Sequence, residues 1–269
     1  PATQANLSLL RSRGVQVMEP GEGELACGEV GSGRLPGIED LTREILRLAA
    51  RRETWAGETV LVTAGPTREY LDPARVLTNP SSGRMGYAVA EEALQRGARV
   101  LLVSGPSPLP APWGAEVIRV GTTEEMRAAV LHALPRATMV IKAAAPADFR
   151  PTLVSTEKSP KEHLSRLELE PTPDILREVM QKKNGQLVVG FSAGTGDYLE
   201  AARRKLRDKQ LDLVVANRVD RPGAGFESET NEGVMITAGG DEEVLPRLSK
   251  REMAVRLLDR VESLRKGRS

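Results

Sequence analysis

Apolar strand patterns alternate with helix patterns from Thr59 onward, and this alternation constrains the fold more than any other feature of the sequence. Strands are predicted over 59–64, 99–104, 115–120 and 137–145, and helices over 85–96 and 122–134. Strand 137–145 is apolar except for Lys142, as is typical of the centre of a parallel sheet. The pattern predicts an α/β fold with a doubly wound, Rossmann-like, mostly parallel sheet. Ligands bind such sheets beyond the carboxyl ends of the strands, where Gly65, Gly105 and Ala145 fall.

The second half of the chain continues this alternation and then changes to an antiparallel pattern. Strands are predicted over 164–170, 186–191 and 211–216, and helices from about 173 to 183 and from about 197 to 209. Thr172 is the expected N-cap of the first of these helices. Residues 232–238 and 242–245 predict a C-terminal β-hairpin extension around Gly239, and Ser249 with Glu252 predicts a capped last helix.

A long connection, residues 61–86, joins the first strand to the first helix, and its length predicts a functional loop. Ser81, Ser82 and Gly83 come directly before the helix, where N–H groups and the positive end of the helix dipole suit a phosphate or carboxylate. A plain N-cap at Ser81 or Ser82 explains the same residues equally well. Gly86 lies where a close backbone approach is expected.

Residues 1–40 differ from the rest of the chain. A helix over 6–13, a strand over 15–18 and a glycine-rich flap over 20–36 are predicted there, and an amphipathic helix follows over 38–53. We therefore expect a short incomplete segment 1–40, a linker 41–57 and a main domain 58–269. The first residues, Pro-Ala-Thr, suggest a fragment of a longer chain.

Composition excludes several classes of function. The net charge of +1 and 3% aromatic content give no basis for nucleic-acid binding. No apolar run approaches the roughly 18 residues of a membrane span. Cys27 is the only cysteine, which excludes an internal disulfide and fits a cytoplasmic location, and two histidines leave little for a histidine-based metal site.

Six motifs carry a resemblance to a known family. They are Val62–Glu69, Asn79–Gly86, Ala143–Pro151, Glu157-Lys158, Pro173–Leu176 and Val189–Ala193. In this order, from about residue 58 to the C-terminus, the sequence resembles bacterial phosphopantothenoylcysteine synthetase, also called phosphopantothenate–cysteine ligase. One such motif is weak evidence, but six in order are specific.

A second resemblance covers only about residues 1–40. Leu25–Glu29 with Gly33-Arg34 is similar to the closing segment of phosphopantothenoylcysteine decarboxylase, the flavoprotein fused ahead of the synthetase in bacterial bifunctional enzymes. In that family the cysteine matching Cys27 is a proton donor beside FMN. No FMN-binding domain precedes it in this sequence, so Cys27 is expected to be a remnant, and FMN is expected only with a complete decarboxylase domain.

The first resemblance implies a two-step ligation. CTP activates the carboxylate of 4′-phosphopantothenate to an acyl-cytidylate and releases pyrophosphate, and the amine of cysteine then displaces CMP. A carboxylate and a triphosphate repel each other, so such a site needs cationic groups, oriented N–H donors and a divalent cation, here Mg²⁺. Small-molecule substrates are thus the expected partners, together with a second copy of the chain, because family members are dimers.

The resemblance also implies roles for individual residues. Asn79 matches the asparagine that holds the acyl-cytidylate, Lys158 the CTP-binding lysine of a flexible loop, and Asp148 a nucleotide contact. The Asp148 carboxylate suits a cytosine amine, a ribose hydroxyl or a metal, and the sequence leaves these open. The other expected binding residues are Gly65, Ser81, Ser82, Gly83, Ala143, Ala144, Lys161, Pro173, Asp174, Ile175, Leu176, Phe191, Lys205 and Lys209.

The sequence departs from the family at a few positions. Arg84 stands where lysine is common, Pro160 interrupts the lysine run, Gly194 replaces an acidic residue and Arg218 replaces an aspartate. The last two leave the choice between CTP and ATP open.

Three alternative functions remain. A decarboxylase activity would belong to a longer native chain. A dinucleotide-binding oxidoreductase lacks the expected Gly-x-Gly-x-x-Gly motif, and a non-catalytic nucleotide-binding module would not need a substrate asparagine together with a lysine loop.

Overall fold

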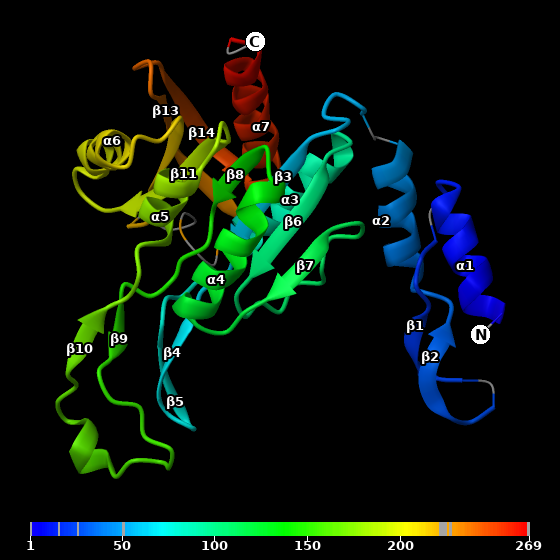
Figure 1. The fold of residues 1–269 in the computed structure, drawn as a ribbon, viewed down its shortest axis with the longest axis horizontal. Coiled ribbons are helices and arrows are strands. Elements are labelled where there is room, and N and C mark those ends of the chain that lie inside the picture. The colour runs from blue at the N-terminus through cyan, green and yellow to red at the C-terminus, as the bar shows by residue number, and fades with distance from the viewer. Residues whose placement is uncertain are drawn as a thin grey trace. The chain divides into compact units, whose positions relative to one another are not determined.

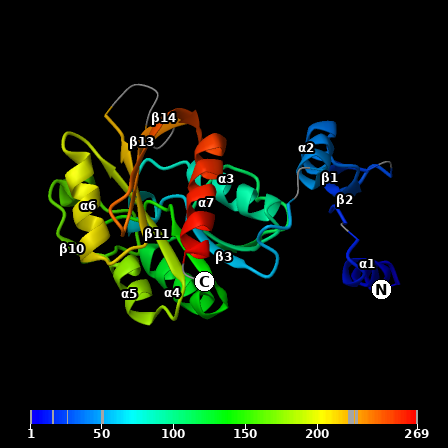
Figure 2. The ribbon, with the colours of Figure 1, turned by 90° about the horizontal axis from the view of Figure 1, so that it is seen from above.

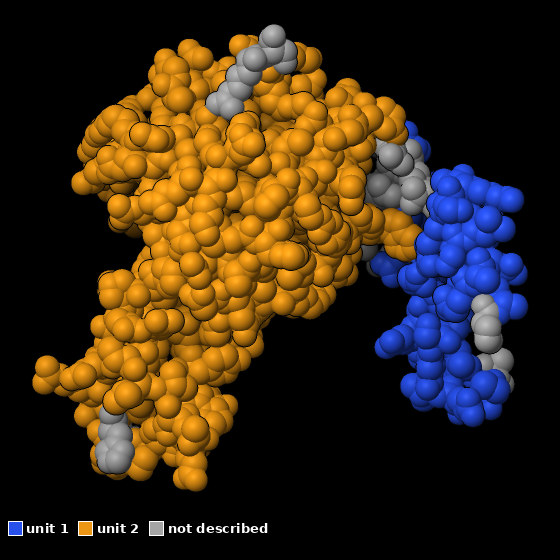
Figure 3. Space-filling model, in the orientation of Figure 1, with its two compact units in different colours: residues 1–50 blue, residues 51–269 orange. Residues whose placement is uncertain are grey.

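The computed structural model describes residues 2–15, 17–25, 27–49, 52–220, 225 and 228–267, and the chain divides into two compact units, 1–50 and 51–269 (Figure 3). Unit 1 consists of α1 (Ala2–Ser12), β1 (Gly21–Glu24), β2 (Val30–Arg34) and α2 (Ile38–Ala49), with β1 and β2 antiparallel. None of the residues of this unit whose side chains are described is buried. The strand predicted over 15–18 is wrong for its described residues, since no described strand pairs with them and an unpaired strand leaves its backbone groups without partners.

Unit 2 is built on an eight-stranded sheet in the order β14-β13-β12-β11-β8-β3-β6-β7 (Figure 1). In chain order these are β3 (Thr59–Ala64), β6 (Arg99–Ser104), β7 (Glu116–Arg119), β8 (Met139–Lys142), β11 (Leu187–Gly194), β12 (Leu213–Arg218), β13 (Thr230–Thr237) and β14 (Glu242–Ser249). Neighbouring strands are parallel along the row β12-β11-β8-β3-β6-β7 of the sheet. Strands β13 and β14 form an antiparallel hairpin at one edge, next to β12. The predicted fold class is confirmed, including the hairpin extension.

Helices cover both faces of this sheet. They are α3 (Arg84–Gln95) and α7 (Lys250–Lys266) on one face, and α4 (Thr123–Ala133), α5 (Ile175–Lys182) and α6 (Tyr198–Asp208) on the other, with a short 3-10 helix η1 (Leu134–Arg136) after α4. Figure 2 shows strand β11 between α6 and α7. Side chains of β3 alternate between two cores: Val60 and Val62 join one, and Leu61 the other. Burying each such side chain stabilises the fold by about 1.5–3 kcal/mol.

Capping boxes start two of these helices, as the sequence predicts. The Thr122 side chain accepts a hydrogen bond from the Glu125 N–H group at the start of α4, and Ser249 accepts one from Glu252 at the start of α7. Each box fixes the first turn of its helix by satisfying N–H groups that have no partner within the helix. Within the described ranges, no helix combines the length and apolar character that a transmembrane span requires.

Two extensions leave the sheet beyond the carboxyl ends of its parallel strands (Figure 1). One is the hairpin β4 (Arg68–Asp72) and β5 (Arg75–Thr78). The other, which we call the arm, is residues 149–171, with antiparallel strands β9 (Phe149–Pro151) and β10 (Leu169–Pro171) and the 3-10 helix η2 (Lys161–Leu164). The Ser155 N–H group donates to the Leu71 carbonyl at 3.0 Å, which ties the arm to β4.

Three expectations about strands and loops near the carboxyl ends of the sheet are wrong. The connection 61–86 is not a continuous loop, because β4 and β5 pair within it. The strand predicted over 164–170 is reduced to β10, since η2 and an irregular segment take its first part. Strand β8 ends at Lys142 rather than at residue 145, because the chain leaves the ladder and the Ala145 N–H group donates to the Gly65 carbonyl at 2.9 Å.

Candidate functional site

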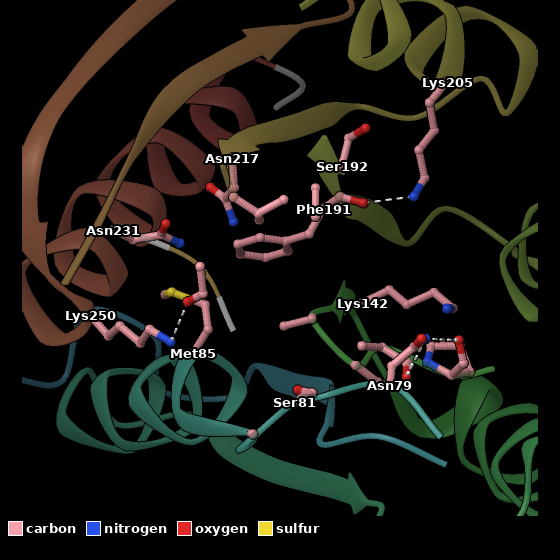
Figure 4. Close-up of a pocket in the computed structure, with 18 of the residues that line it drawn as sticks. Asn79, Ser81, Met85, Lys142, Phe191, Ser192, Lys205, Asn217, Asn231 and Lys250 are labelled. Carbon is pink, nitrogen blue, oxygen red and sulfur yellow. Dashed lines mark hydrogen bonds between the residues drawn. The ribbon is translucent and has the colours of Figure 1, made fainter. Parts of the chain in front are cut away.

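A cavity of about 350 Å³ opens at the carboxyl ends of β8, β11 and β12, next to the crevice between β3 and β8 (Figure 4). The chain runs from β3 to β6 on one side and returns to β8 on the other, so the strand order reverses at this crevice. Such a reversal is the general binding position in open α/β sheets. The lining residues are Asn79, Ser81, Gly83, Met85, Lys142, Ala143, Ala144, Ala145, Pro146, Asp148, Phe191, Ser192, Ala193, Lys205, Asn217, Val219, Gly225, Asn231 and Lys250.

The first turn of α3 forms one wall of the cavity. Its N-cap is Gly83, in the left-handed region at φ 82°, and no side chain caps the helix, so the expected plain N-cap at Ser81 or Ser82 is wrong. Ser81 and Gly83 line the cavity, whereas the Ser82 carbonyl accepts from the Ser107 hydroxyl at 2.8 Å. Gly65 lies against Gly83, because a β-carbon on Gly83 would lie 3.2 Å from the Gly65 nitrogen. Uncapped N–H groups at a helix N-terminus suit an anion.

Gly86 brings this helix against the sheet, as the sequence predicts. A β-carbon at Gly86 would lie 2.5 Å from that of Ala64 and 2.9 Å from the Thr63 carbonyl oxygen. The absence of a side chain therefore lets α3 contact β3 directly.

Asn79 joins two segments that form the cavity. Its side-chain amide donates to the carbonyl oxygens of Ala145, at 3.3 Å, and Pro146, at 3.0 Å. Ala143 and Ala144 lie on the same wall, and the Ala144 N–H group donates to the Thr63 hydroxyl at 3.1 Å. The small side chains of this wall leave the backbone accessible to a ligand, as expected.

Two lysines and a carboxylate meet at what we call the lysine end of the cavity, defined by Lys142, Lys205 and Asp148. The Lys205 ammonium group donates to the Phe191 carbonyl oxygen at 2.6 Å. Burial, together with the charge of Lys205, lowers the pKa of Lys142 to about 8, although Asp174 and Asp148 oppose the shift. Burial also lowers the pKa of Lys205. These ammonium groups are short of compensating charge, so an anionic ligand would stabilise them.

The expected residues 173–176 and Lys209 lie beside the cavity rather than on its wall. Asp174, not Thr172, is the N-cap of α5, because its carboxylate accepts from the Arg177 N–H group while the Thr172 hydroxyl donates to the Ala147 carbonyl at 2.6 Å. Lys209 forms an ion pair with the Asp174 carboxylate. The remaining members of this set, Pro173, Ile175 and Leu176, do not line the cavity, and the last two are buried in the core.

Of the expected residues not yet placed, Lys158 is the one with a described side chain in unit 2, and the structure does not bring it to the cavity. Lys158 is exposed on the arm and is not a lining residue. Lys161 begins η2, and its side chain lies outside the described part of the structure. Cys27 is exposed in unit 1. The structure thus assembles Asn79, the α3 start, Asp148, Phe191 and Lys205, and leaves Lys158 apart.

Sequence reasoning missed the opposite end of the cavity. Its polar residues are Asn217 from β12, Asn231 from β13 and Lys250 at the start of α7, and we call it the amide end. Figure 4 shows the Phe191 ring between the two ends. The available signals were Asn217 at the end of a buried strand pattern and Lys250 directly after a capping serine.

Two departures from the family lie together. A β-carbon at Gly194 would lie 3.0 Å from that of Tyr198, and the Arg218 guanidinium lies 6.0 Å from the centre of the Tyr198 ring. Arg218 also forms an ion pair with Asp220 at 2.8 Å. The two replacements therefore form a packed unit around Tyr198.

The carboxylates of the cavity are few. Among the described residues no group of three or more His, Cys, Asp or Glu side chains is arranged to hold a metal ion, and Asp148 is the only acidic lining residue. Mg²⁺ is commonly held by one or two carboxylates together with substrate phosphates, so this donor set fits a metal that arrives with a nucleotide.

Comparison with known proteins gives one family. The family described as DNA/pantothenate metabolism flavoprotein C-terminal domain matches residues 55–264. The chain is 46% identical over 274 residues to the Coenzyme A biosynthesis bifunctional protein CoaBC of Bacillus subtilis (strain 168). The aligned region covers 99% of this chain and 66% of the relative. It is 40% identical to a cysteine/cysteine sulfinic acid decarboxylase from an unknown prokaryotic organism, covering 98% of this chain and 76% of that protein. The chain thus spans just under two thirds of the Bacillus relative.

Solved structures agree in fold. The crystal structure of the C-terminal domain of CoaBC superposes with a TM-score of 0.69 at 38% identity, covering 80% of this chain and 99% of that domain. The Cab2 H337A mutant in complex with phosphopantothenate-cysteine superposes with a TM-score of 0.59 at 17% identity, which shows a common fold alone.

Proposed function

Because the chain belongs to the family of the DNA/pantothenate metabolism flavoprotein C-terminal domain, we propose that it is a ligase of coenzyme A biosynthesis. Its proposed reaction joins 4′-phosphopantothenate to cysteine at the expense of CTP. The observation that supports it most is the position of Asn79 between the uncapped start of α3 and the lysine end of the cavity.

The proposed first step activates the acid. A carboxylate oxygen of phosphopantothenate attacks the α-phosphorus of CTP, the bond from that phosphorus to the bridging oxygen breaks, and pyrophosphate leaves with the electron pair. Lys142, Lys205 and the N–H groups of α3 would neutralise charge that otherwise keeps the two anions apart. Mg²⁺ bound through Asp148 and the phosphates would supply further positive charge.

The proposed second step forms the amide. The cysteine nitrogen attacks the acyl carbon, the bond to the phosphate oxygen breaks, and CMP leaves. Asn79 would hold the intermediate between the steps. Its amide already donates to two carbonyl groups of the opposite wall, so it needs little reordering to contact a ligand.

The remaining expectations stay proposals. Lys158 would act only after the arm moves toward the cavity or in the site of a second copy. We infer a homodimer, for which exposed apolar side chains on and beside the arm, such as Tyr70, Phe149 and Leu153, offer a surface; the hairpin around Gly239 is the other candidate contact. A cytoplasmic location, and a place in a larger bifunctional protein, fit the same role.

The test uses the purified chain with phosphopantothenate, CTP and Mg²⁺ but without cysteine. Pyrophosphate release that depends on phosphopantothenate supports the proposal, and a parallel reaction with ATP decides the nucleotide. Absence of pyrophosphate, with hydride exchange to a nicotinamide instead, would favour an oxidoreductase. Tightly bound FMN in the purified protein would contradict the expectation that this chain performs no decarboxylation.

A further inference from the structure

The amide end of the cavity is made of polar side chains that the fold buries almost completely. Asn217, Asn231 and Lys250 are 8%, 4% and 6% exposed, and they come from three different elements. Strands β12 and β13 pair so that Asn217 lies opposite Gly233. A β-carbon at Gly233 would lie 2.1 Å from the Ala216 carbonyl oxygen and 3.2 Å from the Asn217 side-chain oxygen, so only glycine lets β13 pass this close to the backbone and to the asparagine.

The side-chain oxygens of the two amides have no partner in the part of the chain that the structure describes. The Oδ1 atoms of Asn217 and Asn231 are two of the four buried side-chain nitrogen or oxygen atoms that have no hydrogen-bond partner among the described residues. Leaving such a group buried and unpaired costs about 1–3 kcal/mol. Two on one cavity wall indicate a ligand that brings hydrogen-bond donors.

Lys250 supplies the positive charge of this end. Its ammonium group donates to the Gly225 carbonyl oxygen at 3.3 Å. Burial and the nearby charge of Arg84 lower the pKa of Lys250 to about 8. Lys250 is also the first residue of α7, whose dipole adds positive potential at that point. An anionic group beside Lys250 would offset all three effects.

A zwitterion matches this set of groups better than a polyphosphate does. One cation and two neutral amides correspond to one carboxylate and one ammonium group, whereas a triphosphate requires several cations, which the lysine end and the α3 start provide. Met85 and Phe191 line the space between the ends and offer contacts that a thiol side chain favours.

We propose that Lys250, Asn217 and Asn231 form the binding site for the amino acid of the ligation, with Lys250 on its carboxylate and the two amides on its ammonium group. This inference rests on the proposed function and names the residues that bind the second substrate. The ammonium group loses a proton to water before its nitrogen attacks the acyl carbon, and CMP leaves from the same carbon. The lysine end remains the place of the nucleotide.

The experiment separates the two steps of the reaction. Exchange of labelled pyrophosphate into CTP, measured with phosphopantothenate and without cysteine, reports the first step alone. Steady-state kinetics with varied cysteine report the second. Lys250→Met and Asn231→Leu are expected to raise KM for cysteine by roughly 30-fold and 10-fold while the exchange rate stays within about twofold of that of the unaltered protein. Lys182→Met, at an exposed lysine on α5, is the matched control and should change neither.

Two further substrates sharpen the test. Cysteamine lacks the carboxylate, so Lys250→Met should leave its KM unchanged. Hydroxylamine needs no amino-acid site, so it should trap the acyl intermediate equally well in every variant. Asn217→Leu is the second amide variant, and melting temperatures confirm that each variant is folded.

The outcomes are distinct. If exchange falls in parallel with ligation, the amide end binds the nucleotide phosphates and the inference is overturned. If folded variants leave both steps unchanged, the amide end is not a substrate site. If the unaltered protein shows no exchange at all, the proposed function fails and this inference fails with it.

Discussion

Lys205 and Lys158 carry the same side chain, and the family resemblance assigns both to the same nucleotide, but the fold holds them differently. Lys205 is partly buried, donates to the Phe191 carbonyl and has a lowered pKa. Lys158 is exposed on the arm. A fixed, dehydrated ammonium group attracts an anion before any motion occurs, whereas a hydrated one on an extension contributes only after it has moved. The cavity lysines should therefore govern binding, and the arm lysine should govern turnover.

Among the substitutions in the cavity and on the arm, replacement of Asn79 in the cavity should reduce product formation most. In Asn79→Asp a carboxylate would face the carbonyl oxygens of Ala145 and Pro146 and would repel the anionic intermediate. We expect product formation to fall by about 100-fold or more while nucleotide binding is retained. Turnover measured by mass spectrometry, beside a nucleotide titration, checks this. Unchanged turnover would refute the role of Asn79.

Lys205→Met tests whether the cavity lysine governs nucleotide binding. Loss of a buried cation is expected to weaken nucleotide affinity by about 30-fold, measured by calorimetry. Lys209→Met is the matched control on the same helix, because Lys209 is paired with Asp174 beside the cavity. An equal loss in both variants would show that the two lysines act together, as the sequence resemblance implies.

Lys158→Met tests whether the arm lysine governs turnover. We expect kcat to fall by about 10-fold with the nucleotide dissociation constant nearly unchanged, because the exposed lysine joins the site only during turnover. Stopped-flow and equilibrium titrations separate the two quantities. A loss of affinity as large as that of Lys205→Met would mean that the arm is already closed in solution.

Lys142→Met tests the cost of burying a cavity lysine, and its effect on stability should be the smallest of the four effects. The pKa of Lys142 is lowered to about 8 in the folded chain, so below pH 8 the lysine is charged in both states and bears the full burial penalty. Between that pH and its unfolded pKa the unfolded chain binds more protons, so stability rises with pH. Removing the charge should raise Tm at pH 7 by roughly 2–4 °C, and the gain should vanish above about pH 10.5. A pH-independent gain would point to packing instead.

Sequence reasoning reached the sheet because β3 and β6 are apolar runs, and it reached α4 and α7 because their capping boxes are local. It missed the β4–β5 hairpin, because the side chains that its strands bury most, Glu69 and Asp72, are charged rather than apolar, and its turn has no glycine. Local patterns report on side chains that a strand or helix buries, and these strands bury few.

The residues of the site also differ in how far the sequence could predict them. Asn79, Ser81 and Gly83 are close in sequence and form a recognisable motif. Asn217, Asn231 and Lys250 are scattered over the last third of the chain. They meet only because β13 returns antiparallel to β12, and β14, which pairs with β13, leads into α7. No spacing rule links them, so only the folded chain brings them together.

The contact at Gly86 has a consequence for how this protein can diversify. Because only main-chain atoms and the Ala64 methyl group separate α3 from β3 at this point, the height of the donor groups above the sheet does not depend on rotamers. Related enzymes can therefore exchange wall residues to accept other acids or other nucleotides without relocating the N–H groups at the start of α3. A methyl group at this one position would displace them all at once.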